Sequence, residues 1–334
     1  MEKNKSSQPK EIEPWGVNVL YIYLTIIAWT LGIFFLFRHD IQMHGYFMMI
    51  GAYSLYAGMV QRLFFPAKKY ISLHLATLIA LAIPFSHYFQ ALAFSLLTVT
   101  EIWSLYDLKS YGVKLSKFPL NILVLISPPL SAISWALLNF HDFWILVPPL
   151  FSYLLGVNMG VYSATLGNKM YTGYTQVPLI AMVLLTFLYK IMLPVTLVIY
   201  LGYILIKRTR KRIMISALLT LIISIIVPIS AVYLGDMLHA FTLDVMIPYF
   251  MSCITYSISG YNYPKEWAIP ILMAFAFYFR FISILFKESV VFGVVAVLYF
   301  IYLNKDSLGW MSMKYGMSKK YLEPYFKGKG IISS

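Results

Sequence analysis

The chain has 334 residues, of which 60% are hydrophobic and only 12% charged, and its formal net charge is +13. So few charged residues cannot cover the surface of a soluble protein of this length, which excludes soluble enzyme classes and indicates an integral membrane protein. The one cysteine, Cys253, excludes disulfides, cysteine-ligated iron–sulfur clusters and covalently attached c-type haem.

Long apolar runs recur from Trp15 to Asn304, and a run of about 20 apolar residues crosses the hydrocarbon core as a helix. Alternating strand patterns are missing from the sequence, so we expect an all-α transmembrane bundle. In chain order, the twelve predicted spans are 15–37, 43–64, 70–86, 89–106, 119–138, 143–165, 177–189, 191–206, 213–233, 238–259, 267–286 and 289–304. The breaks after the third and seventh spans rest on few residues, and the charge distribution favours them.

With twelve spans and both termini in the cytoplasm, all but four of the 26 Lys and Arg residues fall on the cytoplasmic side, as the positive-inside rule requires. The exceptions are Arg38, Lys190, Arg280 and Lys287. We therefore expect a multi-pass protein of the cell membrane, with a cytoplasmic segment at 1–14, the bundle at 15–304 and a basic cytoplasmic tail at 305–334 that can touch membrane lipid. Because the charge follows topology, no nucleic-acid partner is expected.

Five of the six histidines fall at the outer ends of the spans: His39, His44, His87, His141 and His239. His44 and His239 differ from the others because each begins an apolar helix, where an ionisable side chain is costly and is functional by default. Asp40 stands four residues before His44 and Asp236 three before His239. Each of these carboxylates could accept a hydrogen bond from its imidazole.

The same two histidines occupy matching places in a weak internal repeat. Residues 43–48 (MHGYFM) align with 238–243 (LHAFTL), and a Phe-Pro pair at 65–66 aligns with a Tyr-Pro pair at 263–264. Residues 15–112 and 213–310 therefore look like parallel copies, which predicts three arcs of four helices.

Such a chain resembles subunit I of the haem–copper oxidases and the related NnrS-like membrane proteins. The runs that carry the likeness are HGYFMMIG at 44–51 and HAFTL at 239–243. The resemblance implies that His44 and His239 ligate one low-spin haem b near the outer leaflet, with Asp40 and Asp236 orienting the imidazoles and Arg280 beside a propionate. Gly51 and Gly58, on roughly the face of His44, would leave room for the macrocycle.

The chain also departs from the oxidase pattern. Spans 143–165 and 177–189 contain no histidine, and Met237 stands where a second histidine of the tenth helix would be. An oxygen-reducing dinuclear centre is therefore not expected, and the chain is at most an electron-transfer subunit. The resemblance implies a membrane subunit of a respiratory complex that passes electrons between quinol and an exterior redox subunit, as in archaeal b-type cytochrome complexes.

Two other functions stay open. A secondary transporter would use the intramembrane charges Glu101, Asp244 and Arg280, with helices broken by proline. Instead of contacting a propionate, Arg280 could also pair with Asp244 or Glu101 in a buried ion pair that has no catalytic task. The chain could instead be a haemless membrane anchor or assembly subunit, in which His44 and His239 are remnants of a lost site.

Overall fold

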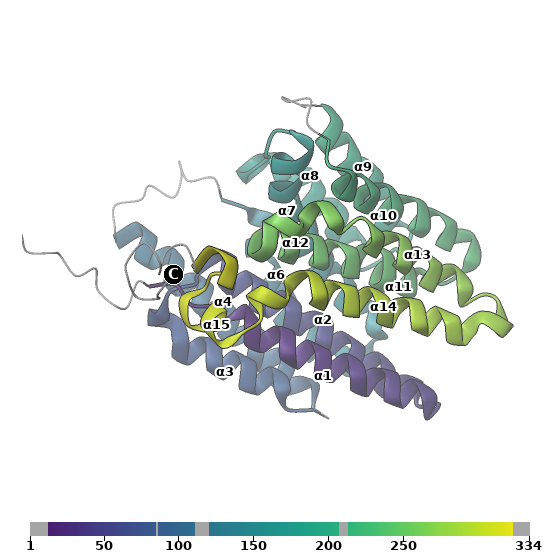
Figure 1. The fold of residues 1–334 in the computed structure, drawn as a ribbon, viewed down its shortest axis with the longest axis horizontal. Helices are drawn as coiled ribbons and strands as arrows, with labels where there is room; N and C mark the ends of the chain where they lie inside the picture. The colour runs from purple at the N-terminus through teal and green to yellow at the C-terminus, as the bar shows by residue number, and fades with distance from the viewer. Residues whose placement is uncertain (1–12, 85, 111–119, 207–212, 323–334) are drawn as a thin grey trace, which may run out of the picture. The chain divides into compact units, whose positions relative to one another are not determined.

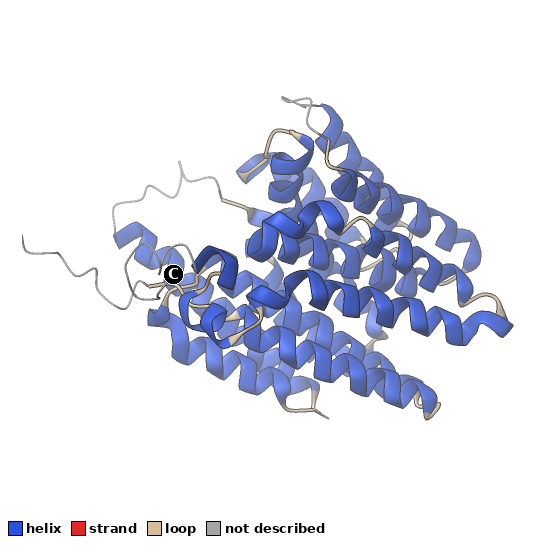
Figure 2. Ribbon diagram, in the orientation of Figure 1, coloured by secondary structure: helices blue, strands red, loops and turns tan. Residues whose placement is uncertain are grey.

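The computed structural model describes residues 13–84, 86–110, 120–206 and 213–322, which form helices and loops but no strand (Figures 1 and 2). The expected all-α class is confirmed. Most of the predicted N-terminal segment 1–14, the basic cluster at 207–212 and the tail beyond Leu322 lie outside the described residues. The chain divides into two compact units, residues 1–111 with 306–334 and residues 112–305.

Unit 1 is built on a hairpin of two long helices. Its helices are α1 (Asn18–Phe37), α2 (Ile41–Phe64), α3 (Ile71–Ala82), α4 (His87–Ser110) and the short α15 (Trp310–Tyr315). The turn between α1 and α2 is made by His39, whose φ of 60° is left-handed, and by Asp40, whose carboxylate accepts a hydrogen bond from the Met43 amide at 3.0 Å. An aspartate at this position satisfies amide groups that the first helical turn leaves without partners.

The end of the described chain returns to the start of unit 1. The Gly16 amide donates to the Met313 carbonyl at 2.8 Å, and the Tyr23 hydroxyl donates to the Leu308 carbonyl at 2.8 Å. The guanidinium of Arg62 donates to the carbonyl of Gly316. Residues 306–322, the described part of the predicted basic tail, are therefore anchored on α1 and α2 (Figure 1).

Unit 2 holds the remaining helices. They are α5 (Ile122–Leu125), α6 (Ser127–Ala136), α7 (Val147–Leu166), α8 (Val177–Leu185), α9 (Met192–Ile206), α10 (Ile215–Leu234), α11 (Met237–His239), the π-helical η7 (Ala240–Met246), α12 (Ile247–Ser259), α13 (Ala268–Phe279) and α14 (Phe286–Asn304). Short 3-10 turns join them: η4 (Leu138–Phe140), η5 (Phe143–Leu146), η6 (Gly173–Gln176), η8 (Gly260–Lys265) and η9 (Ser283–Leu285).

Helix α7 forms the core of unit 2 and is buried along nearly its whole length. It begins with Pro148 and Pro149, which fit the first helical turn because the amide hydrogens lost there have no helical partner. It ends at Gly167, whose φ of 74° is the left-handed cap that glycine adopts without strain. The side-chain amide of Asn121 crosses to the Gly156 carbonyl at 2.8 Å and ties α5 to α7.

Each of the twelve predicted spans contains helix, and six helical segments of the described chain are long and apolar enough to cross a membrane. These are Asn18–Phe37, His87–Ser110, Phe143–Leu166, Ile215–Leu234, Met237–Lys265 and Phe286–Ser307. The span predicted at 119–138 is instead two helices, because Pro128 and Pro129 start a new one at Ser127. The span predicted at 267–286 ends as a helix at Phe279, which leaves Arg280 in the following loop.

Candidate functional site

The predicted haem ligand of unit 1 is already engaged with the neighbouring helix. The Nδ1 atom of His44, in the first turn of α2, lies 2.9 Å from the carbonyl oxygen of Gly32 on α1. Asp40, predicted to orient this imidazole, caps the helix through its contact with the Met43 amide. His44 belongs to unit 1 and His239 to unit 2.

The face of α2 that was expected to leave room for a macrocycle is filled. A methyl group added to Gly51 would lie 2.4 Å from the Trp29 ring, and one added to Gly58 would lie 2.6 Å from Cβ of Tyr21. Both aromatic side chains belong to α1 and pack directly onto the glycines. The interpretation of these glycines as a haem cradle is therefore wrong, since they allow two helices to approach closely. On this face the residues do not fit a haem.

The predicted residues of unit 2 form a charged network at the start of η7. The Asp236 carboxylate lies 2.8 Å from Nδ1 of His239 through one oxygen and 3.2 Å from the Arg280 guanidinium through the other. Asp236 also caps α11 by accepting from the His239 amide at 3.3 Å. Arg280, for which Asp244 or Glu101 was considered as a partner, pairs with Asp236 instead.

This network fixes the charge of Asp236. Burial alone would raise the pKa of this carboxyl, but the hydrogen bonds from His239 and the positive charge of Arg280 outweigh burial and hold the pKa below its usual value. Asp236 is therefore ionised at neutral pH. Its geometry with His239 is that of a carboxylate that orients an imidazole.

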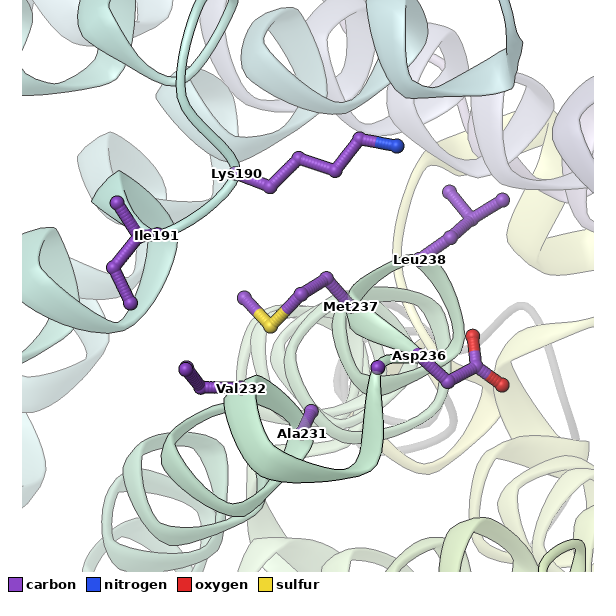
Figure 3. A pocket seen from close by; sticks show the side chains of 8 residues that line it. Lys190, Ile191, Ala231, Val232, Asp236, Met237 and Leu238 are labelled. Carbon is purple, nitrogen blue, oxygen red and sulfur yellow. The ribbon is translucent and has the colours of Figure 1, made fainter.

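A small pocket lies beside this network (Figure 3). Its volume is about 220 Å³, and its lining includes Lys190, Ile191, Val232, Asp236 and Met237. Figure 3 shows the thioether of Met237 in the middle of the pocket and the Asp236 carboxylate on the side away from Ile191. Since pockets for drug-sized ligands measure roughly 300–1,000 Å³, this one is too small for a haem. No group of three or more histidine, cysteine, aspartate or glutamate side chains that could hold a metal ion occurs among the described residues.

The most unusual side chain of unit 2 is Asp244, which lies in the π-helical segment η7. It is fully buried, and neither of its oxygens has a hydrogen-bond partner among the described residues. An ionised carboxylate without a partner costs several kcal/mol in such a place, so the neutral acid is the stable form. π-Helical turns are rare and occur frequently at functional sites. Glu101 of α4, in unit 1, is also buried and has one oxygen without a described partner.

The next buried hydroxyl group on the helix of Asp244 belongs to Tyr249, which contacts two neighbouring helices. The Ser224 hydroxyl of α10 donates to the Tyr249 hydroxyl of α12 at 3.0 Å, and the Asn158 side chain of α7 reaches the Tyr249 carbonyl at 3.3 Å. Tyr162 packs edge-on against the Tyr249 ring. The sequence points to Asp244 but not to these hydroxyl groups, because Tyr and Ser on a membrane helix are usually packing residues.

No protein-family model, curated protein or solved structure matches this chain. The resemblance to the oxidases therefore stays a prediction, and the function has to be argued from the chemistry of the described residues.

Proposed function

We propose that this chain is a proton-translocating membrane protein, in the class of secondary transporters, and that Asp244 is the group that carries the proton. The observation that carries the proposal is a fully buried carboxyl group without a described partner, inside a π-helical segment of a helix of membrane length. A structural ion pair would have placed a cation beside it. Unpaired acids inside membrane helices mark ion pathways and proton relays.

The surroundings of Asp244 support this role. Irregular backbone at membrane depth is tolerated where it is buried in protein or lines a polar path, and η7 is such a segment. Asp236, eight residues earlier, is a carboxylate held in the charged form by its partners. Two carboxyl groups, one at the cap of this helix and one within it, thus have environments that favour opposite protonation states, a pattern that separates a fixed charge from a proton-exchanging group.

The test is proton influx into proteoliposomes that contain a pH-sensitive dye, driven by an imposed potassium diffusion potential. We expect vesicles with the wild-type protein to acidify, and vesicles with Asp244→Asn to behave like protein-free ones. Asp142→Asn is the matched control, because Asp142 is an exposed carboxylate paired with Lys190 at 3.1 Å. Equal influx with wild type and Asp244→Asn would refute the proposal.

The electron-transfer function implied by the oxidase resemblance is the second candidate. The Asp236–His239 pair favours it, since metal-ligating histidines usually donate their second nitrogen to such an acceptor. The filled face at Gly51 and Gly58 counts against it. A reduced-minus-oxidised optical spectrum of the purified protein, repeated with His239→Ala, decides: a b-type signal that the variant loses would favour electron transfer.

A further inference from the structure

The helix that carries Asp244 ends at a second buried acid. The run Met237–Lys265 is followed at once by Glu266, which is 1% exposed, and neither of its oxygens has a hydrogen-bond partner among the described residues. The residues on either side, Lys265 and Trp267, are exposed. The turn therefore directs Glu266 inward while its neighbours face outward. Between the two acids the chain forms the end of the π-helical η7, the α-helix α12 and the 3-10 turn η8, and the backbone leaves the helical conformation at Ser259.

A series of buried polar side chains lies between the two acids along the chain. We name it the polar stripe; its members are Asp244, Tyr249, Ser252, Thr255, Ser259, Tyr263 and Glu266, each no more than 1% exposed. From Tyr249 to Ser259 the spacing is three or four residues, which places these side chains on one face of α12. Tyr263 and Glu266 keep this spacing in the sequence, but they follow the bend at Ser259 and belong to η8 and the residue after it. The first step, from Asp244 to Tyr249, is five residues, the repeat of the π-helical hydrogen bonds of η7.

Neighbouring helices supply polar groups to this face. Ser224 of α10 donates to Tyr249, and the Asn304 side chain of α14 donates to Thr255 at 3.0 Å. Within the polar stripe itself, the Ser252 and Tyr263 hydroxyls lie 3.1 Å apart. Side chains one helical turn apart have Cβ atoms about 5–6 Å apart, a gap that one hydroxyl group or water spans. The polar stripe is thus a path of donors and acceptors inside a helix bundle.

The turn that holds Glu266 is fixed to its neighbours. Ser216 donates to the Pro264 carbonyl at 3.2 Å, and Tyr299 donates to the Lys265 carbonyl at 2.9 Å. Glu266 is therefore buried by a fixed turn. The titratable groups around it are the hydroxyls of Tyr263 and Tyr299 and the thiol of Cys253, none of which offers a positive charge. Burial raises the pKa of Glu266 well above its ordinary value.

We propose that Glu266 is a second proton-exchanging group, and that the polar stripe carries protons between Glu266 and Asp244. The inference rests on the proposed function of Asp244. In each step a carboxylic acid or hydroxyl donates its proton to the next oxygen, which passes on its own, so no bond other than O–H changes. Under the predicted topology, Asp244 exchanges protons at the outer side and Glu266 at the cytoplasmic side.

The experiment compares proton influx into proteoliposomes for wild type, Asp244→Asn, Glu266→Gln and Tyr263→Phe. Glu288→Gln is the matched control, because Glu288 is an exposed acid of α14. We expect Glu266→Gln to lower influx roughly tenfold, which corresponds to about 1.4 kcal/mol in the barrier, and Glu288→Gln to leave it unchanged. Tyr263→Phe, which keeps both acids and removes one hydroxyl of the polar stripe, should also lower it.

The outcomes separate the two proposals. If Asp244→Asn abolishes influx while Glu266→Gln and Tyr263→Phe keep the wild-type rate, Glu266 and the stripe have no part in the path and the proposed function stands. If Asp244→Asn also keeps that rate, the proposed function fails as well. Infrared spectra of the wild type and of Glu266→Gln at neutral pH test the protonation of Glu266 independently of transport. The variant should lose one band of a protonated carboxylic acid. An unchanged band would show that Glu266 is not protonated and would overturn its role as a proton-exchanging group.

Discussion

The Glu266→Gln variant tests whether Glu266 is buried without a partner. The measured quantity is the free energy of unfolding as a function of pH, so no transport assay is needed. The variant keeps the size of the side chain and removes its ionisation. Below about pH 3, the side chain at this position is neutral in wild type and variant, folded and unfolded, so the difference in unfolding free energy between them is constant. Any change in that difference at higher pH comes from ionisation of Glu266.

The sign follows from the direction of the pKa shift. Glu266 of the unfolded chain ionises near pH 4.3 (roughly the value in model peptides), while burial keeps the folded form protonated to a much higher pH. The folded state then binds more protons than the unfolded state, so wild-type stability falls as pH rises, by about 1.4 kcal/mol per pH unit up to the raised pKa. Glu266→Gln escapes this loss. For a domain of about 150–250 residues, the size range of unit 2 (residues 112–305), a change of about 1.4 kcal/mol in unfolding free energy shifts the unfolding temperature by roughly 3–6 °C.

The assay can use the chain's one cysteine. Cys253 is buried in α12, so a dye that reacts with free thiols reports the unfolding of the helix that precedes Glu266. Unfolding curves of wild type, Glu266→Gln and the exposed control Glu288→Gln, recorded from about pH 3 upward, should diverge only for Glu266→Gln. Other titrating groups cancel in the comparison. Parallel curves for wild type and Glu266→Gln would show that Glu266 is solvated or paired, and the reasoning would be refuted.

Three further changes test separate parts of the structure. Asp236→Asn should lower the free energy of unfolding by about 1–3 kcal/mol at neutral pH. Because the pKa of Asp236 is low in the folded state, the wild type loses this contribution as acid protonates the carboxylate, and the variant should not show that loss. The same acid dependence in both proteins would contradict the network. Gly51→Ala, whose new methyl group meets the Trp29 ring, should lower the free energy of unfolding by about 1–3 kcal/mol in calorimetry although alanine is the better helix former. Gly293→Ala in α14, with nothing within 4 Å, should raise it by up to about 1 kcal/mol. Tyr249→Phe should lower the free energy of unfolding by about 1 kcal/mol, because it removes the hydrogen bond with Ser224, and it should slow proton influx. An influx equal to that of the wild type would show that Tyr249 is not part of the proton path.

The positions of the helices follow from sequence because each apolar run must satisfy its own backbone hydrogen bonds in lipid. The break between α8 and α9 is an example: Lys190 is the only charge in a long apolar stretch, and the structure ends one helix at Leu185 and begins the next at Met192. The number of helices that cross the bilayer stays a prediction. Composition alone also marked Asp244, since an acid in a membrane helix is costly wherever it points.

The partners of the site could not be predicted, because they depend on tertiary packing. Asp236 and Arg280 come from different elements, and nothing in their local sequences shows that the loop after α13 meets the turn before α11. The filling of the space at Gly51 by Trp29 depends on the crossing of two helices. The polar stripe, by contrast, is visible as a spacing of three and four residues, but it is hidden when tyrosine is counted as an apolar residue.

Asp236 and Asp244 differ in their surroundings, and this difference is the main support for the proposed function. The two residues have the same side chain and stand eight positions apart on one stretch of helix, so intrinsic chemistry cannot distinguish them. Asp236 has an imidazole, a guanidinium and an amide as partners, and these hold it ionised. Asp244 has none among the described residues, and the π-helical turn places it at the head of a row of hydroxyls. A purely structural acid would be expected to pair with a cation as Asp236 does. The unpaired acid is costly to keep charged and inexpensive to keep protonated, which is the property a proton carrier needs.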